Sequence, residues 1–347
     1  MLTLLFLLTC SALIVLGRRA ESSDCSAFST DGLAGSHFQY YRFYDFRNIS
    51  ASSTDRRSRR RDAADVSNRT VVDSSWTDDW YVRDFPRASP GGHSIPVNFI
   101  PERVEIVNST NESEHYGTYL SLSTARVDEE NQESGEITFS EFNVTSASIR
   151  VLGRVRGAPG GVAGIFTYQN DTQESDIELF TRAPGTFVQY SNQPSSCGEP
   201  DWIPIPGATV NNTIPQHRTY SDWLVHRLDW VPGRSVFFVN NEQTNTTDLH
   251  VPVSDPPSAV YLDMWSANST WSGSMDIGQN ASFDIQWVEL VFNTTDEMIE
   301  ERTEGPVCAV GAIDLQAVEE SGAGRVLLMP GVVALLLLTA FAQLLSK

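Results

Sequence analysis

The sequence predicts an all-β protein built as a large sandwich of two sheets. From about residue 76 to residue 300, short runs of apolar and β-branched residues alternate with Gly, Pro, Asn and Asp. This is the pattern of strands joined by turns. Long amphipathic helical periods are absent outside the C-terminal tail. The strands show no repeat period, which favours a two-sheet sandwich over a repeat architecture.

Several segments carry this strand pattern clearly, and turn residues separate them. Gly157 and the run from Pro159 to Gly161 turn the chain before one strand, and Val-Pro-Gly at 231–233 turns it between two others. The predicted strands are 137–142, 148–155, 162–168, 175–181, 187–190, 226–230, 235–239, 259–265 and 282–292.

The composition narrows the class of function. The chain has 347 residues, of which 40% are hydrophobic, and this is enough for a sizeable core. The formal net charge of −20 excludes nucleic acid as a partner, because nucleic-acid binding needs a basic face. Most of the acidic charge is expected to form a solvated surface, which suits a neutral polysaccharide partner.

The N-terminal region predicts secretion. Residues 2–16 form an apolar run that is short for a membrane span, so 1–17 is expected to be a signal peptide, with an uncleaved anchor as the alternative. The segment 18–75 is expected to be a lead-in with an aromatic first strand at 38–47 and a flexible Arg- and Ser-rich loop. N-glycosylation sequons support export, and they begin at Asn48, Asn68, Asn108, Asn111, Asn143, Asn170, Asn211, Asn245, Asn268, Asn280 and Asn293.

The C-terminal region carries a second apolar segment at 326–345. As a helix it would span about 30 Å, enough to cross a bilayer. Small residues at 321–323 precede it, as in a signal for a glycosylphosphatidylinositol anchor. We expect 76–300 to be the functional domain, 301–325 a linker, and 326–345 an anchor signal or a membrane helix. Both alternatives tether a secreted protein to the outer face of the plasma membrane or to the cell wall.

The cysteines fit an oxidising compartment. Cys10 would leave with the signal peptide, so an odd number remains. Cys25 and Cys308 bracket the domain, which favours a bridge between them and leaves Cys197 free or paired outside the chain. The spacing gives no zinc pattern.

The sharpest local feature is the segment 173–182, which reads Gln-Glu-Ser-Asp-Ile-Glu-Leu-Phe-Thr-Arg. Side chains alternate between the faces of a strand, so Glu174, Asp176 and Glu178 point one way and the residues between them point towards a core. Neighbouring like charges are destabilising in a strand, so stability does not favour this pattern. A solvated acidic surface is the structural alternative.

Hydrolysis of a glycosidic bond gives a chemical reason for three acids. A retaining enzyme needs a carboxylate nucleophile and a carboxylic acid about 5–5.5 Å apart. Residues four apart on a strand have Cα atoms roughly 13 Å apart, so the carboxyl groups of the two glutamates must lean together. Asp176, between them, can hydrogen-bond the nucleophile, and the crowded charges raise the pKa of one acid so that it stays protonated.

The trio matches the short catalytic motif E-x-D-x-E, and segments on either side match in the same order. The chain here resembles glycoside hydrolase family 16, which includes laminarinases, lichenases and xyloglucan transferases. The resemblance covers about residues 76–297, and the segment 38–47 looks like fungal members. It implies a concanavalin A-like jelly-roll β-sandwich of two antiparallel sheets, with Glu174 as nucleophile, Asp176 as its assistant and Glu178 as general acid/base. The other matching segments are 162–168, 222–239, 261–265 and 271–273.

The resemblance implies an extracellular glycosidase that cleaves β-1,3 or mixed β-1,3/1,4 bonds of cell-wall glucan with retention. Ser175 and Gln173 depart from better-known members, which carry a bulky aliphatic residue and an acid there, so linkage specificity stays open. A glucan transglycosylase shares the first step and is an alternative, as is a non-catalytic carbohydrate-binding or wall protein. Neither binding nor wall structure needs the acids, so the intact trio favours the enzyme. A monomer without cofactor or metal is expected.

Aromatic and amide side chains are the candidates for sugar binding, because the apolar faces of pyranose rings pack on indoles. Trp265 and Trp271 are favoured because they match the substrate-side region of the family, whereas Trp230 is expected in the core. Core packing is the structural alternative for every Trp. The further candidates are Trp80, Trp202, Tyr190, Asn192 and Gln193.

Overall fold

The structure is a computed structural model, and it is nearly all β. The elements outside the sheets are short 3₁₀ helices: η3 (Ser75–Asp78), η4 (Pro101–Arg103) and η5 (Pro215–His217). The residues that the structure describes are 25–31, 36–47, 49, 68–70, 75–89, 94–109, 116–182, 184–198, 203–295 and 305–311.

One antiparallel sheet carries the acidic motif, and we call it the cleft sheet. The motif strand β12 has a hydrogen-bonded neighbour on each side, which fixes its position. The strands follow one another in the order β3 (Asn68–Thr70), β4 (Trp80–Arg83), β9 (Gln132–Phe139), β20 (Ala259–Trp265), β11 (Val162–Asn170), β12 (Gln173–Phe180), β13 (Phe187–Asn192) and β16 (Thr209–Thr213).

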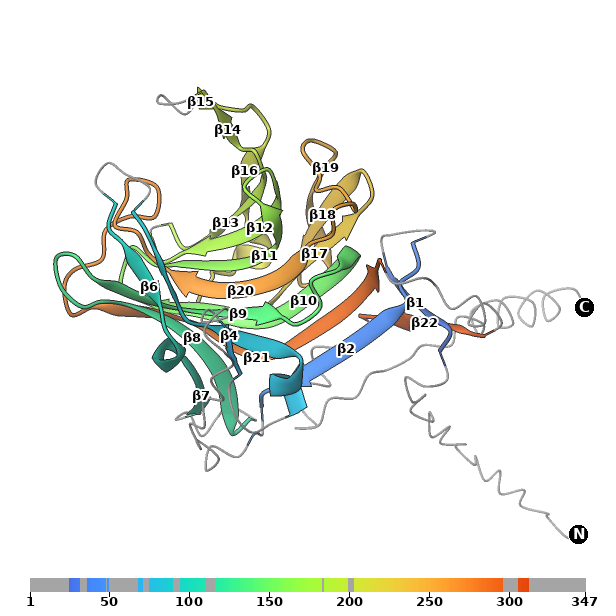
Figure 1. Cartoon of the computed structure of the whole chain (residues 1–347), viewed down its shortest axis with the longest axis horizontal. Coiled ribbons are helices and arrows are strands. Elements are labelled where there is room, and N and C mark those ends of the chain that lie inside the picture. The colour runs from blue at the N-terminus through green and yellow to red at the C-terminus, as the bar shows by residue number, and fades with distance from the viewer. Residues whose placement is uncertain are drawn as a thin grey trace, which may run out of the picture.

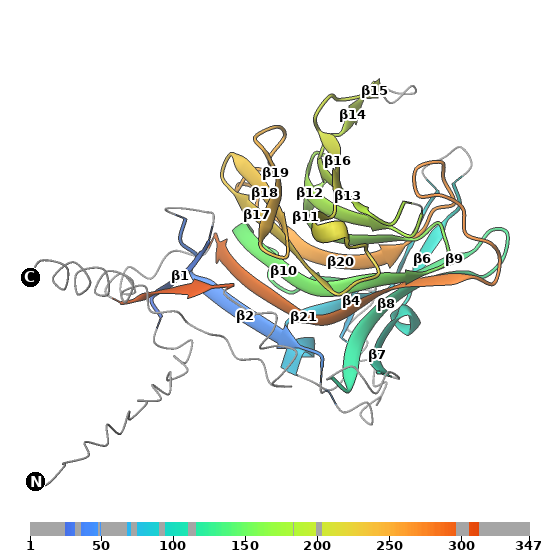
Figure 2. The ribbon, with the colours of Figure 1, turned by 180° about the vertical axis from the view of Figure 1, so that it is seen from behind.

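A second antiparallel layer, the outer sheet, packs behind the cleft sheet (Figures 1 and 2). Its long strand β21 (Asn280–Thr294) pairs with β10 (Val144–Gly157) along one edge and with both β8 (Thr118–Arg126) and β2 (Tyr40–Asp45) along the other. The remaining strands are β7 (Val104–Asn108) beside β8, and β17 (Leu224–Val231), β18 (Arg234–Val239) and β19 (Glu242–Thr247) beside β10.

Smaller pairings complete the described chain. β5 (Phe85–Arg87) pairs with β6 (Val97–Phe99), and β6 runs parallel to the start of β9. β14 (Ser196–Cys197) and β15 (Ile203–Pro204) form a short hairpin that projects beyond β16 in Figure 1. β1 (Ala27–Thr30) pairs in parallel with β22 (Val307–Val310), so the two ends of the folded domain lie side by side.

The hydrophobic core fills the space between the two sheets. Ile165 and Ile177 of the cleft sheet and Ile149 and Leu290 of the outer sheet belong to one cluster, and each is at most 1% exposed. Burying a side chain of this size contributes about 1.5–3 kcal/mol, so the two inner faces fix the pairing of the layers. The predicted all-β jelly-roll sandwich of two antiparallel sheets is confirmed.

The described chain also tests the predicted boundaries. Each predicted strand from 137–142 to 282–292 overlaps an observed one, and most observed strands are longer. The linker prediction is wrong at residues 307–310, because these residues form β22 within the folded domain. The signal segment 1–17 and the apolar segment 326–345 lie outside the described residues. Within the described part, none of the helices has the length and apolar character needed to span a bilayer.

A disulfide joins Cys25 to Cys308 and closes the terminal β1–β22 pair, as the sequence predicts, and Cys197 is a free, exposed thiol. Next to β1, the Asp31 carboxylate lies 2.6 Å from Nη1 of Arg227 on the outer sheet. Arg227 is 1% exposed, and a buried guanidinium needs such a partner. The terminal pair therefore adds a second acidic partner to Arg227, whose guanidinium also pairs with Asp229 within the outer sheet.

Replacing both Cys25 and Cys308 by Ser tests this closure. The bridge spans 283 residues of chain, so its loss increases the entropy of the unfolded state and should lower the free energy of unfolding by about 2–5 kcal/mol. Urea unfolding measures the change. Cys197→Ser is the control and should shift the free energy by less than about 0.5 kcal/mol. Equal urea midpoints for the double variant and the wild type would show that the disulfide does not stabilise the folded state.

Candidate active site

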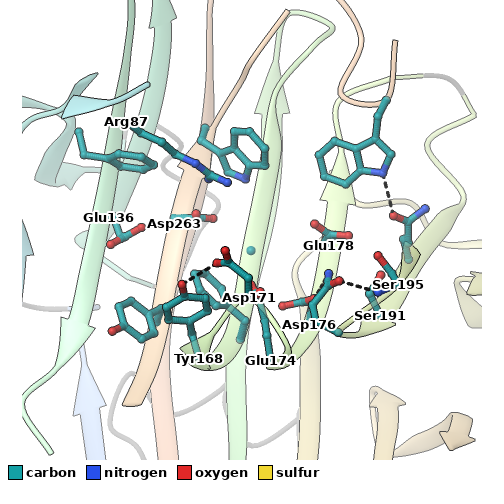
Figure 3. A pocket seen from close by; sticks show the side chains of 18 of the residues that line it. Arg87, Glu136, Tyr168, Asp171, Glu174, Asp176, Glu178, Ser191, Ser195 and Asp263 are labelled. Atoms are coloured by element: carbon teal, nitrogen blue, oxygen red, sulfur yellow. Dashed lines mark hydrogen bonds between the residues drawn. The ribbon is translucent and has the colours of Figure 1, made fainter. Parts of the chain in front are cut away.

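A cleft of about 610 Å³ lies on the solvent side of the cleft sheet (Figure 3). Acidic and aromatic side chains dominate its surface. The lining residues are Arg83, Phe85, Arg87, Phe99, Glu136, Gly164, Phe166, Tyr168, Asp171, Glu174, Asp176, Glu178, Gln189, Ser191, Gln193, Ser195, Thr209, Tyr261, Asp263, Trp265 and Trp271.

Strand β12 places Glu174, Asp176 and Glu178 together in this cleft. Its other face carries Ile177 and Leu179, which are fully buried in the core. Side chains alternate between the two faces of a strand. Because the apolar face must be buried, the three acids can face only the cleft. Asp176 is 5% exposed, and the two glutamates are partly exposed.

Burial raises the pKa of all three acids, and neighbouring groups then distinguish them. Burial and then repulsion by Glu174 raise the pKa of Glu178 to about 8. Burial raises the pKa of Glu174 to about 7, although a hydrogen bond with Asp176 opposes this rise. Burial and the charges of both glutamates raise the pKa of Asp176 well above its usual value. Of the two glutamates, Glu178 therefore keeps its proton to higher pH, and Glu174 is the one that ionises first.

Gln193, just beyond the end of β13, holds the middle acid of the trio. Its Nε2 donates to Oδ2 of Asp176 at 3.4 Å, and its backbone N donates to the carbonyl of Glu174 at 3.0 Å. Its Oε1 in turn accepts from the backbone N of Ser195 at 2.8 Å. The hydrogen bond from Ser195 therefore orients the Gln193 side chain towards Asp176.

Two further carboxyl groups, Glu136 of β9 and Asp263 of β20, lie side by side in the cleft near Arg87 (Figure 3). They are directly opposite one another in the β9–β20 register, and they are 6% and 4% exposed. Burial, opposed by the charge of Arg83, raises the pKa of Glu136 to about 7. Burial and then the charge of Glu136 raise the pKa of Asp263 well above its usual range. The Arg83 Nε lies 3.5 Å from Oε1 of Glu136.

Gly164 of β11 separates this pair from the trio. It is the register partner of Glu178 on one side and of Asp263 on the other. A Cβ at this position would lie 2.5 Å from Oδ1 of Asp263. The glycine therefore leaves the room in which the Asp263 carboxylate extends over β11 towards the trio.

Two indoles form a wall of the cleft. The ring centroids of Trp265 and Trp271 are 5.6 Å apart, and the Trp271 Nε1 donates to Oε1 of Gln189 at 3.1 Å. The Arg87 guanidinium lies 5.0 Å from the centroid of the Trp265 ring. These contacts hold both rings at the cleft, where the sequence places them; their stacking on a sugar stays a prediction.

The prediction of sugar binding is wrong for Tyr190, Asn192 and Trp80, because these side chains lie on the inner faces of their strands. Tyr190 is 1% exposed, stacks on Phe237 at 4.3 Å and shares a hydrogen bond with Thr244. Asn192 is equally buried and accepts a hydrogen bond from Ser175.

Trp80 of β4 is fully buried in the core and packs edge-on against Tyr44. Of the remaining candidates, Gln193 does reach the cleft. Trp202 lies outside the described residues.

The sequence interpretation missed the residues that other strands bring to the cleft. Tyr261 and Asp263 precede Trp265 at alternate positions of β20, and all three line the cleft. That spacing was a usable signal, because positions two apart share a face. Glu136 and Arg83 carried no comparable signal, because Glu136 follows the acids of residues 128–133 and the sequence does not distinguish it from them, and Arg83 stands at the end of a short strand. Among the described residues, no group of three or more His, Cys, Asp or Glu side chains could hold a metal ion.

Several solved structures have a similar chain arrangement. A prokaryotic β-1,3-1,4-glucanase (lichenase) from a mouse hindgut metagenome is 15% identical and covers 73% of this chain and 99% of its own, with a TM-score of 0.48. The Bacillus licheniformis β-glucanase is 17% identical (61% and 92%; TM-score 0.46), and the Rhodothermus marinus laminarinase is 14% identical (63% and 91%; TM-score 0.46). No protein-family model and no curated protein matches the chain. At identities of 14–17%, these similarities concern the fold alone.

The raised pKa of Glu178 predicts how stability depends on pH. The unfolded pKa of a glutamate is about 4.3, whereas the folded value is about 8, so the folded state keeps a proton that the unfolded state loses. Stability from this group is complete below the unfolded pKa and is lost as pH rises through the folded pKa. Glu178→Gln should therefore gain stability relative to the wild type as the pH rises from 4.5 to 9.

Thermal unfolding of both proteins across this pH range measures the difference. Glu105→Gln is the control, because Glu105 is exposed on β7 and its variant should keep a constant offset from the wild type. A constant offset for Glu178→Gln as well would contradict the raised pKa.

Proposed function

We propose that this protein is a retaining glycoside hydrolase that cleaves internal glycosidic bonds of β-glucan. The observation that carries the proposal is the carboxyl trio of β12, in which Glu174 and Glu178 flank the buried Asp176 in one open cleft. The choice of β-1,3 or mixed β-1,3/1,4 glucan follows the resemblance of the sequence to glycoside hydrolase family 16. The accumulation of like charges on one strand face supports a chemical role, because it costs stability.

In the first step, the Glu174 carboxylate attacks the anomeric carbon of the glucan. The bond to the leaving oxygen breaks, and Glu178 gives that oxygen its proton. The pKa of about 8 keeps Glu178 protonated at neutral pH, and the lower value of about 7 leaves an ionised fraction of Glu174. The products are a glycosyl ester on Glu174, a shortened glucan with a free hydroxyl, and an ionised Glu178.

In the second step, the ionised Glu178 takes a proton from water as the water attacks the same carbon. The ester bond to Glu174 breaks, and both glutamates return to their starting states. Two inversions give net retention of configuration. Asp176 acts as a positioning residue: its hydrogen bond with Glu174 lowers the pKa of Glu174, and Gln193 fixes the side chain that makes this bond.

The cleft supports a polymeric substrate. It is open along the sheet, and its aromatic side chains offer flat apolar surfaces on either side of the acids. Phe166 and Tyr261 stack with centroids 5.1 Å apart on the floor, and the Trp265–Trp271 pair forms a wall. Sugar rings bound along this path would place one glycosidic bond at the trio.

The proposed location is outside the cell, on the outer face of a membrane or in the wall. The Cys25–Cys308 bridge supports an oxidising compartment. The sequon residues Asn170, Asn211 and Asn280 are exposed, as N-glycan acceptors must be. Release of the protein from cells by a phosphatidylinositol-specific phospholipase would support a lipid anchor, and retention after this treatment would support a membrane helix.

Glu174→Gln tests the nucleophile. It removes the attacking carboxylate at nearly constant size, so kcat on laminarin or lichenan should fall by at least about 10³-fold. Glu105→Gln on β7 is the matched control and should keep the wild-type rate. Unchanged turnover by Glu174→Gln would overturn the mechanism. Wild-type binding of glucan without turnover would favour a carbohydrate-binding protein instead.

Glu178→Ala tests retention independently of the natural substrate. An aryl β-glucoside with a good leaving group needs no acid, so this variant should still form the glycosyl ester. Hydrolysis of that ester should be about 10²–10⁴-fold slower than in the wild type. Added azide should then speed turnover and give the β-glycosyl azide, which NMR identifies. An α-glycosyl azide would indicate a single inversion and contradict the ester on Glu174.

A further inference from the structure

Asn211, on the edge strand β16, shares a row of the cleft sheet with the proposed general acid/base. Glu178 of β12 is the register partner of Gln189 on β13, and Gln189 is the partner of Asn211. Direct partners on neighbouring strands project to the same face, and Glu178 and Gln189 both line the cleft. Thr209, two residues before Asn211 on β16, lines the cleft as well. Asn211 therefore projects on the cleft side of the sheet.

A chain of hydrogen bonds joins Asn211 to the indole wall of the cleft. Gln189 is 5% exposed, and its Nε2 donates to Oδ1 of Asn211 at 2.8 Å. Its Oε1 accepts from Nε1 of Trp271 at 3.1 Å. These two bonds use both ends of the Gln189 amide, so they set the orientation of the Asn211 amide relative to the Trp271 ring. Asn211 itself is exposed, yet it has a fixed position beside the cleft.

Asn211 also begins the sequon Asn-Asn-Thr at 211–213. Strand alternation puts Asn211 and Thr213 on the same face of β16, and both are exposed. An N-linked glycan is attached at Nδ2, whereas the hydrogen bond from Gln189 uses Oδ1. Glycosylation can therefore leave this hydrogen bond intact.

Attachment of the glycan transfers an oligosaccharide from a lipid-linked diphosphate donor. The bond between carbon 1 of the first sugar and the phosphate oxygen breaks, and a bond between that carbon and Nδ2 of Asn211 forms. Nδ2 gives up one proton, and the lipid diphosphate leaves. The side chain stays a neutral amide, so it keeps its acceptor oxygen for Gln189.

We propose that Asn211 carries an N-linked glycan that closes the β16 end of the cleft and limits the length of glucan that can bind beyond Glu178. In the described chain the cleft sheet ends at β16. Strands are about 4.8 Å apart, so Asn211 stands roughly 10 Å from β12. A bulky glycan there occupies the space into which a polymer would extend. This closure rests on the proposed function, which supplies both the export of the chain and the identity of its substrate.

Peptide mass spectrometry of the full chain, secreted from a glycosylating yeast or insect host, tests the occupancy of Asn211. Release of N-glycans by an amidase converts each occupied asparagine to aspartate, so Asn211 should be read as aspartate in the wild type. Thr213→Val removes the sequon and keeps the shape of the side chain, so Asn211 should stay asparagine. Thr213→Ser is the matched control, since it keeps the sequon and should stay occupied. An unoccupied Asn211 in the wild type overturns the proposal.

Hydroxyl-radical footprinting tests the closure without any glucan. Oxidation of Trp271, measured by mass spectrometry, should be about twofold higher in Thr213→Val than in Thr213→Ser, because the bulky glycan no longer covers that end of the cleft. Phe43, partly exposed on the outer sheet, should be oxidised equally in both variants. Any glycan at the sequon residues Asn170 and Asn268 is common to both. Equal oxidation of Trp271 overturns the closure.

Asn211→Asp replaces Thr213→Val if thermal unfolding shows that Thr213→Val does not fold. Aspartate cannot be glycosylated, and its carboxylate still accepts the hydrogen bond from Gln189. It should give the same rise in Trp271 oxidation relative to Thr213→Ser. Absence of that rise in the variant that folds overturns the closure.

Hydrolysis of β-1,3-glucan oligomers separates the closure from the proposed function. Removal of the glycan opens further binding positions, so the ratio of kcat/KM for a hexamer to that for a trimer should be about threefold higher in Thr213→Val than in Thr213→Ser. Turnover with an unchanged ratio overturns the closure and leaves the hydrolase standing. Absence of turnover in every variant, with the rise in Trp271 oxidation present, supports the closure and contradicts the hydrolase.

Discussion

The burial of one face of β12 is the constraint on which the site depends. Ile177 and Leu179 pack into the core against the outer sheet, and a strand can bury only one of its faces against a given layer. A shift of register by one residue would bury the three acids and expose the apolar side chains. The core therefore fixes the direction of the carboxyl groups much more strongly than any contact among them could.

The same packing explains why the cleft can hold so many acids. Neighbouring β11 and β13 hold β12 from both sides, so repulsion among the trio cannot separate the strand from the sheet. Burial, together with repulsion from Glu174 at Glu178, appears instead as raised pKa values, about 7 for Glu174 and about 8 for Glu178. The destabilising environment of the cleft thus gives Glu174 and Glu178 different proton affinities, which is what general acid–base catalysis requires.

The outer sheet compensates its buried charges in a different way. Arg150 and Arg227 are each about as buried as the cleft acids, but Glu289 and Asp229 pair with them directly within the same layer. These ion pairs compensate the two buried guanidinium charges within the fold.

By itself, the sequence determined the class of fold and the shared face of Glu174, Asp176 and Glu178, and it favoured the terminal bridge. Strand alternation is a local property with a period of two, so the trio could be assigned to one face before any pairing was known. The positions of Cys25 and Cys308 at the ends of the domain favoured their pairing, and the structure shows that bridge.

Only the tertiary structure decided which face of each other strand meets the cleft. Tyr190 and Asn192 look like sugar ligands in sequence, yet β13 turns them into the core and presents Gln189 and Ser191 instead. The pair of Glu136 and Asp263 joins positions more than a hundred residues apart through the β9–β20 register. Such a contact depends on which strands become neighbours, and that choice is made by packing of the whole sandwich rather than by local pattern.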